Sequence, residues 1–235
     1  MRARNTPGVD ASVDEAFTNS TWFVALPVFG VASFCVLYAL ASSVYAGVSE
    51  TGYGHLTNYW CDLLAATSPA GHGNPARPFA VLATFVLPLS LVPLWYHLPR
   101  LFAAGARACV AVQVTGCIAM VSATLVWTPM HDLAINVVAV FGFCALLMTL
   151  FNIDRRRHRA VGMSVRWAGA LVLTNYVLWA TGTLVWVIPA VQKAAFLGLF
   201  IWVAIATRAI SRSLRWEREV MDPSAHRLYE SSDAA

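Results

Sequence analysis

Residues Leu133 to Phe151 read LAINVVAVFGFCALLMTLF, a run of 19 residues without a charged side chain. This length is close to the roughly 20 apolar residues that a helix needs to cross the hydrocarbon core of a bilayer. Asp132 precedes the run, and the basic stretch RRRHR follows it at Arg155 to Arg159. We therefore interpret the segment as a membrane-spanning helix with its basic end in the cytoplasm.

The whole chain has the composition of this segment, because 58% of its 235 residues are hydrophobic and only 12% are charged. Soluble domains carry about 25% charged residues. Five other apolar runs extend approximately over Trp22 to Val48, Phe79 to Leu98, Ala104 to Trp127, Trp167 to Ile188 and Val191 to Ile210. The sequence thus predicts an all-α fold: a polytopic bundle of six transmembrane helices over residues 22–211. A segment of residues 1–21 precedes the bundle, a tail of residues 212–235 follows it, and residues 49–78 form its largest loop.

The basic residues set the expected orientation. With six spans both termini share a side, and 14 of the 16 Lys and Arg residues then lie on that side. The two exceptions are Arg77 and Lys193. Because basic loops stay in the cytoplasm during insertion, we predict cytoplasmic N- and C-termini. Lys193 is the single lysine among these residues, which is compatible with a bacterial plasma membrane as the location.

The net charge of +4 does not predict nucleic-acid binding, because the arginines form short clusters at the ends of apolar runs. No Gly-rich phosphate loop, GxSxG elbow or pair of haem histidines occurs, so the cofactor stays unknown. No CxxC or Cys/His spacing typical of zinc is present either.

The remaining polar residues gather on the predicted outer face. They lie in the large loop, at the start of the fourth run and at the start of the sixth. The candidate site residues are His55, Asn58, Asp62, Asn74, Arg77, His131, Asp132, Gln192 and Lys193. Positions 55, 58 and 62 share one face if the loop is helical there. If the helix ends meet, these side chains line one pocket.

Three kinds of chemistry fit such a pocket. Imidazole and carboxylate groups are adequate ligands for a divalent metal. In a hydrolase or acyl transferase, His55 or His131 would be the general base, and Asp62 or Asp132 would orient it. Alternatively, Arg77 and Lys193 hold a lipid phosphate.

For that last chemistry, Asn58, Asn74 and Gln192 are additional substrate-binding candidates. Structural roles compete with all three kinds of chemistry. His55 and Asp62 are then exposed loop residues, Asp132 caps the fourth helix, and Lys193 pairs with Asp132 to join two helices.

Three stretches carry a resemblance to known membrane proteins: YGHLTNYWCD at Tyr53 to Asp62, NPARP at Asn74 to Pro78, and IPAVQK at Ile188 to Lys193. Together with the pair His131–Asp132, they resemble a bacterial family of six-helix membrane proteins of unknown function. The layout is also similar to that of the eukaryotic damage-regulated autophagy modulators and GPI-lipid-remodelling membrane proteins. The resemblance implies six spans, a polar outer-facing cluster and involvement with membrane lipids.

The leading functional hypothesis is therefore binding, sensing or remodelling of a lipid on the non-cytoplasmic face, with membrane lipids as the partners. A small transporter or channel is the first alternative and requires a polar path through the bundle, for which Gln113, Asn136 and Asn175 are the candidates. A structural or regulatory membrane partner is the second alternative. It requires that the outer polar residues do not converge.

Overall fold

The structure is a computed structural model that describes residues 21–45, 52–67 and 71–221. Six long helices make up this part of the chain, and no strand occurs in it. Their bounds are α2 Thr21–Tyr45, α3 Arg77–His97, α4 Ala106–Ala123, α5 His131–Asn152, α6 Arg159–Thr181 and α7 Ile188–Met221. Two short 3₁₀ helices are added, η1 at Trp60–Leu64 and η2 at Leu98–Leu101. The predicted all-α class is confirmed.

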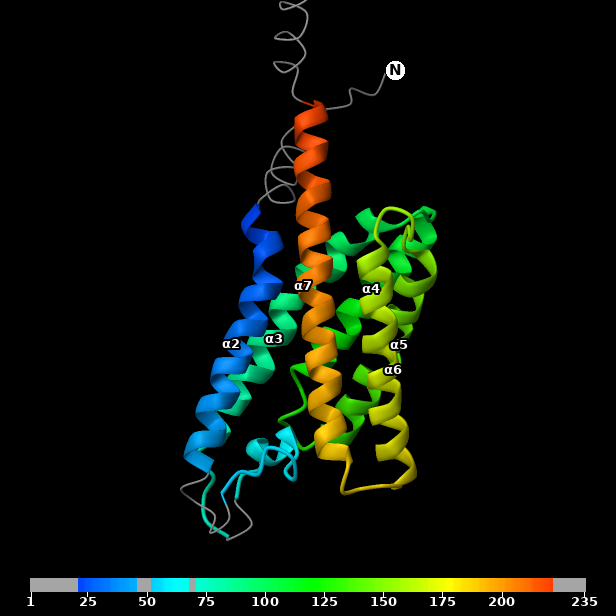
Figure 1. The fold of residues 1–235 in the computed structure, drawn as a ribbon. Coiled ribbons are helices and arrows are strands. Elements are labelled where there is room, and N and C mark those ends of the chain that lie inside the picture. Colours follow the sequence, from blue (N-terminus) through cyan, green and yellow to red (C-terminus); the bar gives the residue numbers. More distant parts are fainter. Residues whose placement is uncertain (1–20, 46–51, 68–70, 222–235) are drawn as a thin grey trace, which may run out of the picture.

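The six helices run alternately up and down and form a closed ring in which α7 returns to α2 (Figure 1). The hairpins α2–α3, α4–α5 and α6–α7 have the most extensive contacts, and α3 also contacts α7 across the ring. Because of this alternation, the loop of residues 52–76 and the turns at 124–130 and 182–187 meet at one end of the bundle (Figure 1). We call this the loop end.

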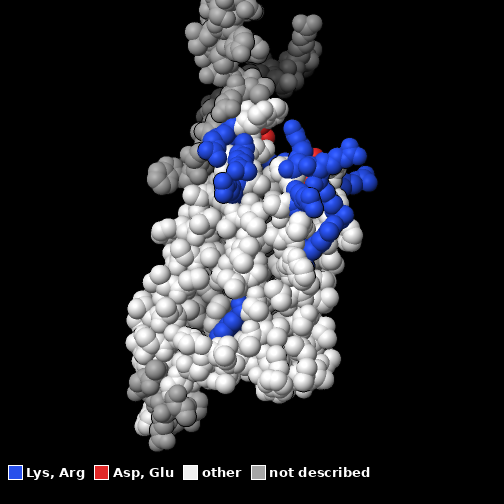
Figure 2. Space-filling model, in the orientation of Figure 1, with Lys and Arg blue, Asp and Glu red and all other residues white. Residues whose placement is uncertain are grey.

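The opposite end holds η2, the turn at 153–158 and the extension of α7 (Figure 1). Lys and Arg side chains gather there, whereas the body of the bundle below them is almost free of charge on the face in view (Figure 2). We call this the arginine-rich end. The segregation of basic residues that the sequence predicts is thus present in the folded chain.

Five of the helices, α2, α3, α4, α5 and α7, are long and apolar enough to cross a membrane. The chain is therefore a multi-pass integral membrane protein. Helix α6 has the length of a span, with 23 residues, but Arg166 and Asn175 lie within it and lower its apolar character. The six-span count rests on this helix.

The predicted fifth run was wrong in its bounds, because α6 begins at Arg159 and ends at Thr181 instead of covering Trp167 to Ile188. Gly182 stops the helix in a left-handed conformation with φ 63°. A glycine adopts this conformation at a helix C-terminus without steric cost. The following residues, including Trp186, are apolar but exposed, so hydropathy alone could not separate this turn from the helix.

Helix α7 is longer than the sixth run predicts. It passes the expected end at Ile210 and continues to Met221, so positions 212–221 of the predicted tail are helical. Residues 1–20 and 222–235, which include most of the predicted terminal segments, lie outside the described residues.

Close packing within the ring depends on glycine at one crossing. A Cβ at Gly116 of α4 would lie 2.3 Å from Cδ2 of Trp95 in α3, so the indole occupies the space that a side chain would need. The Trp95 ring also lies 5.5 Å from that of Trp202 in α7. The α3–α4 contact therefore requires the absence of a side chain at Gly116.

Candidate functional site

The described parts of the loop, residues 52–67 and 71–76, fold back onto the helix ends and are anchored by aromatic packing. Trp60, the first residue of η1, has its ring centroid 4.4 Å from that of Phe196 in α7 and 5.0 Å from that of Tyr38 in α2. Leu63 and Leu64 of η1 are buried in the same apolar cluster. Burying these side chains removes apolar surface from water and holds the loop against the bundle.

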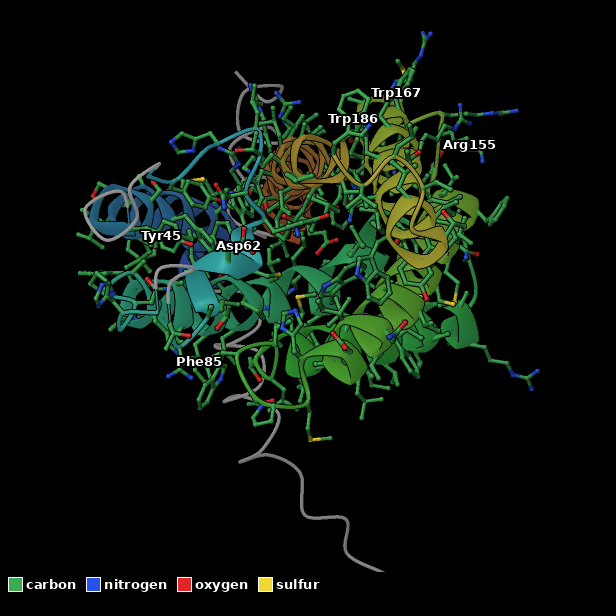
Figure 3. All side chains as sticks on the ribbon, turned by 90° about the horizontal axis from the view of Figure 1, so that it is seen from below. Tyr45, Asp62, Phe85, Arg155, Trp167 and Trp186 are labelled. Atoms are coloured by element: carbon green, nitrogen blue, oxygen red, sulfur yellow. The ribbon has the colours of Figure 1, made fainter. Side chains whose placement is uncertain are left out.

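Asp62 closes the turn at the start of η1. Its Oδ2 accepts hydrogen bonds from the Tyr59 main-chain N–H at 2.9 Å and from Asn58 Nδ2 at 3.1 Å. The Asn58 side-chain oxygen in turn accepts from the Gly54 N–H at 2.9 Å. Viewed from the loop end, Asp62 lies on the loop among the ends of α2, α3 and α7, inside the outline of the bundle (Figure 3). The Asp62 carboxylate thus stabilises the conformation of the loop.

Two side chains of α7 reach the loop from the other side. Lys193 Nζ donates to the main-chain oxygen of Asn58 at 2.6 Å and to that of Pro189 at 3.3 Å. Gln192 Oε1 accepts from the main-chain N–H of Trp60 at 3.1 Å. The bonds to Asn58 and Trp60 join segments more than 130 positions apart in sequence. The start of α7 therefore fastens both sides of the turn that precedes η1.

Asn74 fastens the end of the loop. Its Nδ2 lies within hydrogen-bonding distance of the main-chain oxygens of Asp62, Leu63 and Ala65, at 3.0 to 3.4 Å. Its Oδ1 accepts from the Ala76 N–H at 3.0 Å. Asn74 is buried, so these partners replace the water that its amide loses.

The first residue of α3, Arg77, adds a further bond by donating from Nε to the Leu64 oxygen at 3.2 Å. The guanidinium is only partly buried.

The two histidines and Asp132 do not join this network. His55 is exposed, and its ring packs edge-on against Tyr53 at 5.2 Å. His131 Nδ1 contacts the main-chain oxygen of Val126 within its own turn. Asp132 is an exposed residue in the first turn of α5. The described residues contain no group of three or more His, Cys, Asp or Glu side chains that could hold a metal.

The predicted cluster is therefore divided. The structure brings Asn58, Asp62, Asn74, Gln192 and Lys193 together around the loop, with Arg77 beside them, and leaves His55, His131 and Asp132 outside the network. Two structural alternatives also differ from the observed contacts. The α5 N-cap is Met130 rather than Asp132, and the Lys193 ammonium bonds to main-chain oxygens rather than to the Asp132 carboxylate.

Cys61 is a loop residue that the sequence did not single out. Burial raises the pKa of its thiol to about 11, and the neighbouring Asp62 carboxylate adds to this effect while a hydrogen bond with Gln192 opposes it. A thiol in this state is protonated at neutral pH and is a poor nucleophile. Its position between Asp62 and Trp60 gives no sequence signal beyond membership of the loop.

A hollow of about 610 Å³ lies beside the loop and the start of α3, and we call it the Arg77 hollow. Its lining residues are Ala66, Gly73, Asn74, Pro75, Arg77, Pro78, Val81 and Trp127. Arg77 is the only charged residue of this set. Trp127 comes from the α4–α5 turn and lies near Phe85 of α3, with 6.1 Å between ring centroids. The hollow thus combines one cation, one aromatic ring and largely apolar walls.

Polar side chains within the spans join neighbouring elements. Asn136 of α5 accepts from the Tyr176 hydroxyl of α6 at 3.0 Å. Gln113 of α4 donates to the main-chain oxygen of Tyr96 in α3 at 2.9 Å. Such bonds are the ordinary means by which polar residues link helices in a membrane. They favour a packing role over the polar path that a transporter requires.

Comparison of the chain with protein-family models, with curated proteins and with solved structures finds no match. The family resemblance in the loop and at the start of α7 therefore stays a prediction.

Proposed function

We propose that this protein crosses a bacterial plasma membrane six times, with both termini in the cytoplasm, and binds a phospholipid-like molecule at the loop end. In this arrangement α6 is the fifth of the six spans. The arginine-rich end then faces the cytoplasm, in keeping with the retention of basic residues on that side. The loop end, with Arg77 and Lys193, faces outward.

The observation that carries the binding proposal is the Arg77 hollow. Only the Nε of Arg77 is bonded within the described residues, to the Leu64 oxygen, which leaves its terminal nitrogens to face a ligand. A guanidinium fork matches the geometry of a phosphate group. Trp127 and Val81 supply the apolar contact that the glycerol and upper acyl region of a lipid needs. In the proposed orientation, both features lie close to the outer membrane surface.

Binding or sensing is favoured over remodelling. A hydrolase would need an imidazole or thiolate beside a carboxylate, and His55 and His131 each contact other partners. Cys61 is protonated at neutral pH because of its burial and the Asp62 charge. Asp62 accepts two hydrogen bonds from its own loop. The loop network therefore serves to shape the wall of the hollow.

The test is native mass spectrometry of the full chain from mild detergent with added phosphatidylglycerol. We expect Arg77→Gln to reduce lipid occupancy about tenfold, the effect of losing one charge-assisted contact. Arg77→Lys retains the charge but not the fork and should be intermediate. Arg107→Gln removes an exposed arginine at the opposite end of the bundle and is the matched control.

A helix-content and thermal-stability check separates lost binding from lost folding, because Arg77 also holds the loop through Leu64. Trp127→Ala supplies an independent variant of the same hollow that leaves this bond intact. Equal lipid occupancy in the original chain, Arg77→Gln and Trp127→Ala would remove the basis of the proposal.

A further inference from the structure

A second and larger hollow lies at the arginine-rich end, the opposite end of the bundle from the Arg77 hollow. Its volume is about 720 Å³, and it opens among η2, the start of α6 and the C-terminal half of α7. We call it the arginine hollow. Its lining residues are Arg100, Arg157, His158, Arg159, Ala160, Val161, Ile205, Arg208, Ala209, Arg212, Ser213 and Trp216.

The wall contributed by α7 is a single helical face. Ile205, Arg208, Arg212 and Trp216 follow one another at intervals of three or four residues, so their side chains lie on the same side of the helix. Ile201 continues this face toward the middle of the bundle and is exposed. The face is thus apolar near the bundle centre and basic toward its end.

The wall contributed by the α5–α6 turn and the start of α6 also has a basic part and an apolar part. Arg157 and Arg159 are exposed at the rim, whereas Val161 is buried in the core between the helices. Ile205 of α7 packs against the same core. The hollow therefore has an apolar floor between α6 and α7 and a basic rim above it.

The rim carries uncompensated positive charge. Five of the lining residues are arginines, and none is Asp or Glu. Arg100 is paired with Glu217 at 2.7 Å, the one salt bridge of the described residues. Arg157 lies over the Trp216 ring, with 5.9 Å between its guanidinium carbon and the ring centroid. No hydrogen bond joins the guanidinium groups of the other three arginines to a partner in the described part of the chain.

The retention of basic residues on the cytoplasmic side explains why this end of the bundle is positively charged. It does not explain why five arginines surround the same hollow. Arg107 and Arg155 belong to the same end and do not line the hollow. Arg100 is neutralised by Glu217, and the four remaining guanidinium groups around one space repel one another unless an anion lies among them. A floor of Val161 and Ile205 adds a preference for an anion with an apolar portion.

We propose that the arginine hollow binds the phosphate of an anionic phospholipid. This lipid belongs to the membrane leaflet at the arginine-rich end of the bundle. The headgroup phosphate lies among Arg208, Arg212 and Arg159, and an acyl chain follows the α7 face past Ile205 toward Ile201. Basic pockets between transmembrane helices recognise anionic headgroups in this way. The ligand shares phosphate chemistry with a free phosphate ion, and the apolar track favours the lipid.

The test uses the full chain in lipid nanodiscs or mild detergent. Phosphatidylglycerol, phosphatidylcholine and inorganic phosphate are compared by native mass spectrometry and by the thermal shift that each produces. The variant is Arg208→Gln with Arg212→Gln, and the matched control is Arg107→Gln with Arg155→Gln. We expect the variant to bind phosphatidylglycerol about thirtyfold more weakly, because each basic residue near an anionic headgroup contributes about a factor of five.

The expected result is a loss confined to the Arg208/Arg212 pair, with phosphatidylcholine binding unchanged. Arg208→Lys with Arg212→Lys should restore most of the affinity and so separate charge from folding. An equal loss in the Arg107/Arg155 control would overturn the proposal in favour of unspecific surface attraction. Protection by inorganic phosphate as strong as that by the lipid would overturn the lipid assignment. Arg77→Gln affects only the other end, so the two proposals fail independently.

Discussion

The ammonium nitrogen of Lys193 lies 2.6 Å from the main-chain oxygen of Asn58, a residue 135 positions earlier in the chain. This contact and the Gln192–Trp60 bond beside it connect the beginning of the last helix to the loop between the first two. The same ammonium lies 5.7 Å from the centre of the Tyr53 ring. The loop cannot lift away from the helix ends without giving up these interactions.

Replacing Lys193 by Met should loosen the loop. We expect the free energy of unfolding to fall by about 1.5 kcal/mol, because a hydrogen bond from a charged donor is lost and the Asn58 oxygen is left without this partner. Limited proteolysis within residues 65–67 and 71–73 should become faster at the same time. Arg107→Met, at the opposite end, should leave the cleavage rate unchanged. An intact loop in the Lys193 variant would show that the Trp60 packing and the remaining hydrogen bonds hold the loop without Lys193.

Adding one methyl group at Gly116 should be costly. Gly116→Ala brings a Cβ within 2.3 Å of the Trp95 ring, so the α3–α4 contact must open, with a loss of about 1 to 3 kcal/mol. Gly169→Ala in α6 is the matched control, because no heavy atom lies within 4 Å of the added carbon. The control should be neutral or stabilising by about 0.5 to 1 kcal/mol. Thermal melting in detergent measures both, and similar losses would contradict the close approach.

The six-span arrangement can be tested with single cysteines. In a chain freed of its five native cysteines, Thr183→Cys lies in the α6–α7 turn and Arg156→Cys in the α5–α6 turn. A membrane-impermeant maleimide applied to intact cells should label position 183 and not position 156. Labelling of both positions from the same side would mean that α6 does not cross the bilayer.

Alkylation of Cys61 should have an unusual pH profile. With a pKa of about 11 instead of 9.0, the thiolate fraction at pH 8 is about a hundredfold lower than that of an ordinary thiol. The iodoacetamide rate of a chain that retains only this cysteine should therefore rise steadily from pH 8 to pH 10. Asp62→Asn removes a nearby negative charge and should shift the profile to lower pH. An alkylation rate that levels off by pH 10, as expected of a thiol with a pKa of 9.0, would contradict the raised pKa of Cys61.

His158 should make stability depend on pH. Burial lowers its pKa below the ordinary 6.5, with Asp154 opposing the shift and Arg157 adding to it. The folded state then binds fewer protons than the unfolded state, so stability falls as pH drops below about 6.5. Asp154 also accepts the N–H groups of Arg156 and Arg157, which fixes it beside this turn. His158→Gln should flatten the decline between pH 7 and pH 5, as measured by thermal melting, and an unchanged decline would assign it to other groups.

Most of the long helices could be predicted from the sequence, because each corresponds to a local property, the length of an uncharged apolar run. The bounds of α3 and α5 follow the prediction to within about two residues. The fifth run was misplaced because the Gly182 turn is as apolar as the helix before it. The sixth apolar run ends at Ile210 although α7 continues to Met221, because the last turns of the helix are polar and hydropathy marks membrane crossing rather than helicity.

The polar loop was harder to interpret from sequence, because most of its polar side chains form hydrogen bonds with main-chain groups of the loop instead of facing a ligand. Asn74 was considered a ligand-binding residue, and the structure surrounds it with three carbonyl oxygens. The helical face predicted for positions 55, 58 and 62 does not form, because residues 52–59 are not helical. Asn58 and Asp62 nevertheless share a 3.1 Å hydrogen bond, whereas His55 packs against Tyr53. The convergence of Arg208 and Arg212 with Arg157 depends on the α6–α7 pairing, which no single segment encodes.

Helix α7 joins the two ends of the molecule. Lys193, near the start of the helix, donates a hydrogen bond to the loop. Arg208 and Arg212 line the arginine hollow and follow Lys193 by 15 and 19 residues. At 1.5 Å per residue the intervening stretch is a rod of about 22 to 28 Å, close to the thickness of the hydrocarbon layer. A rod that tilts or slides as one piece conveys a displacement at either membrane surface to the other.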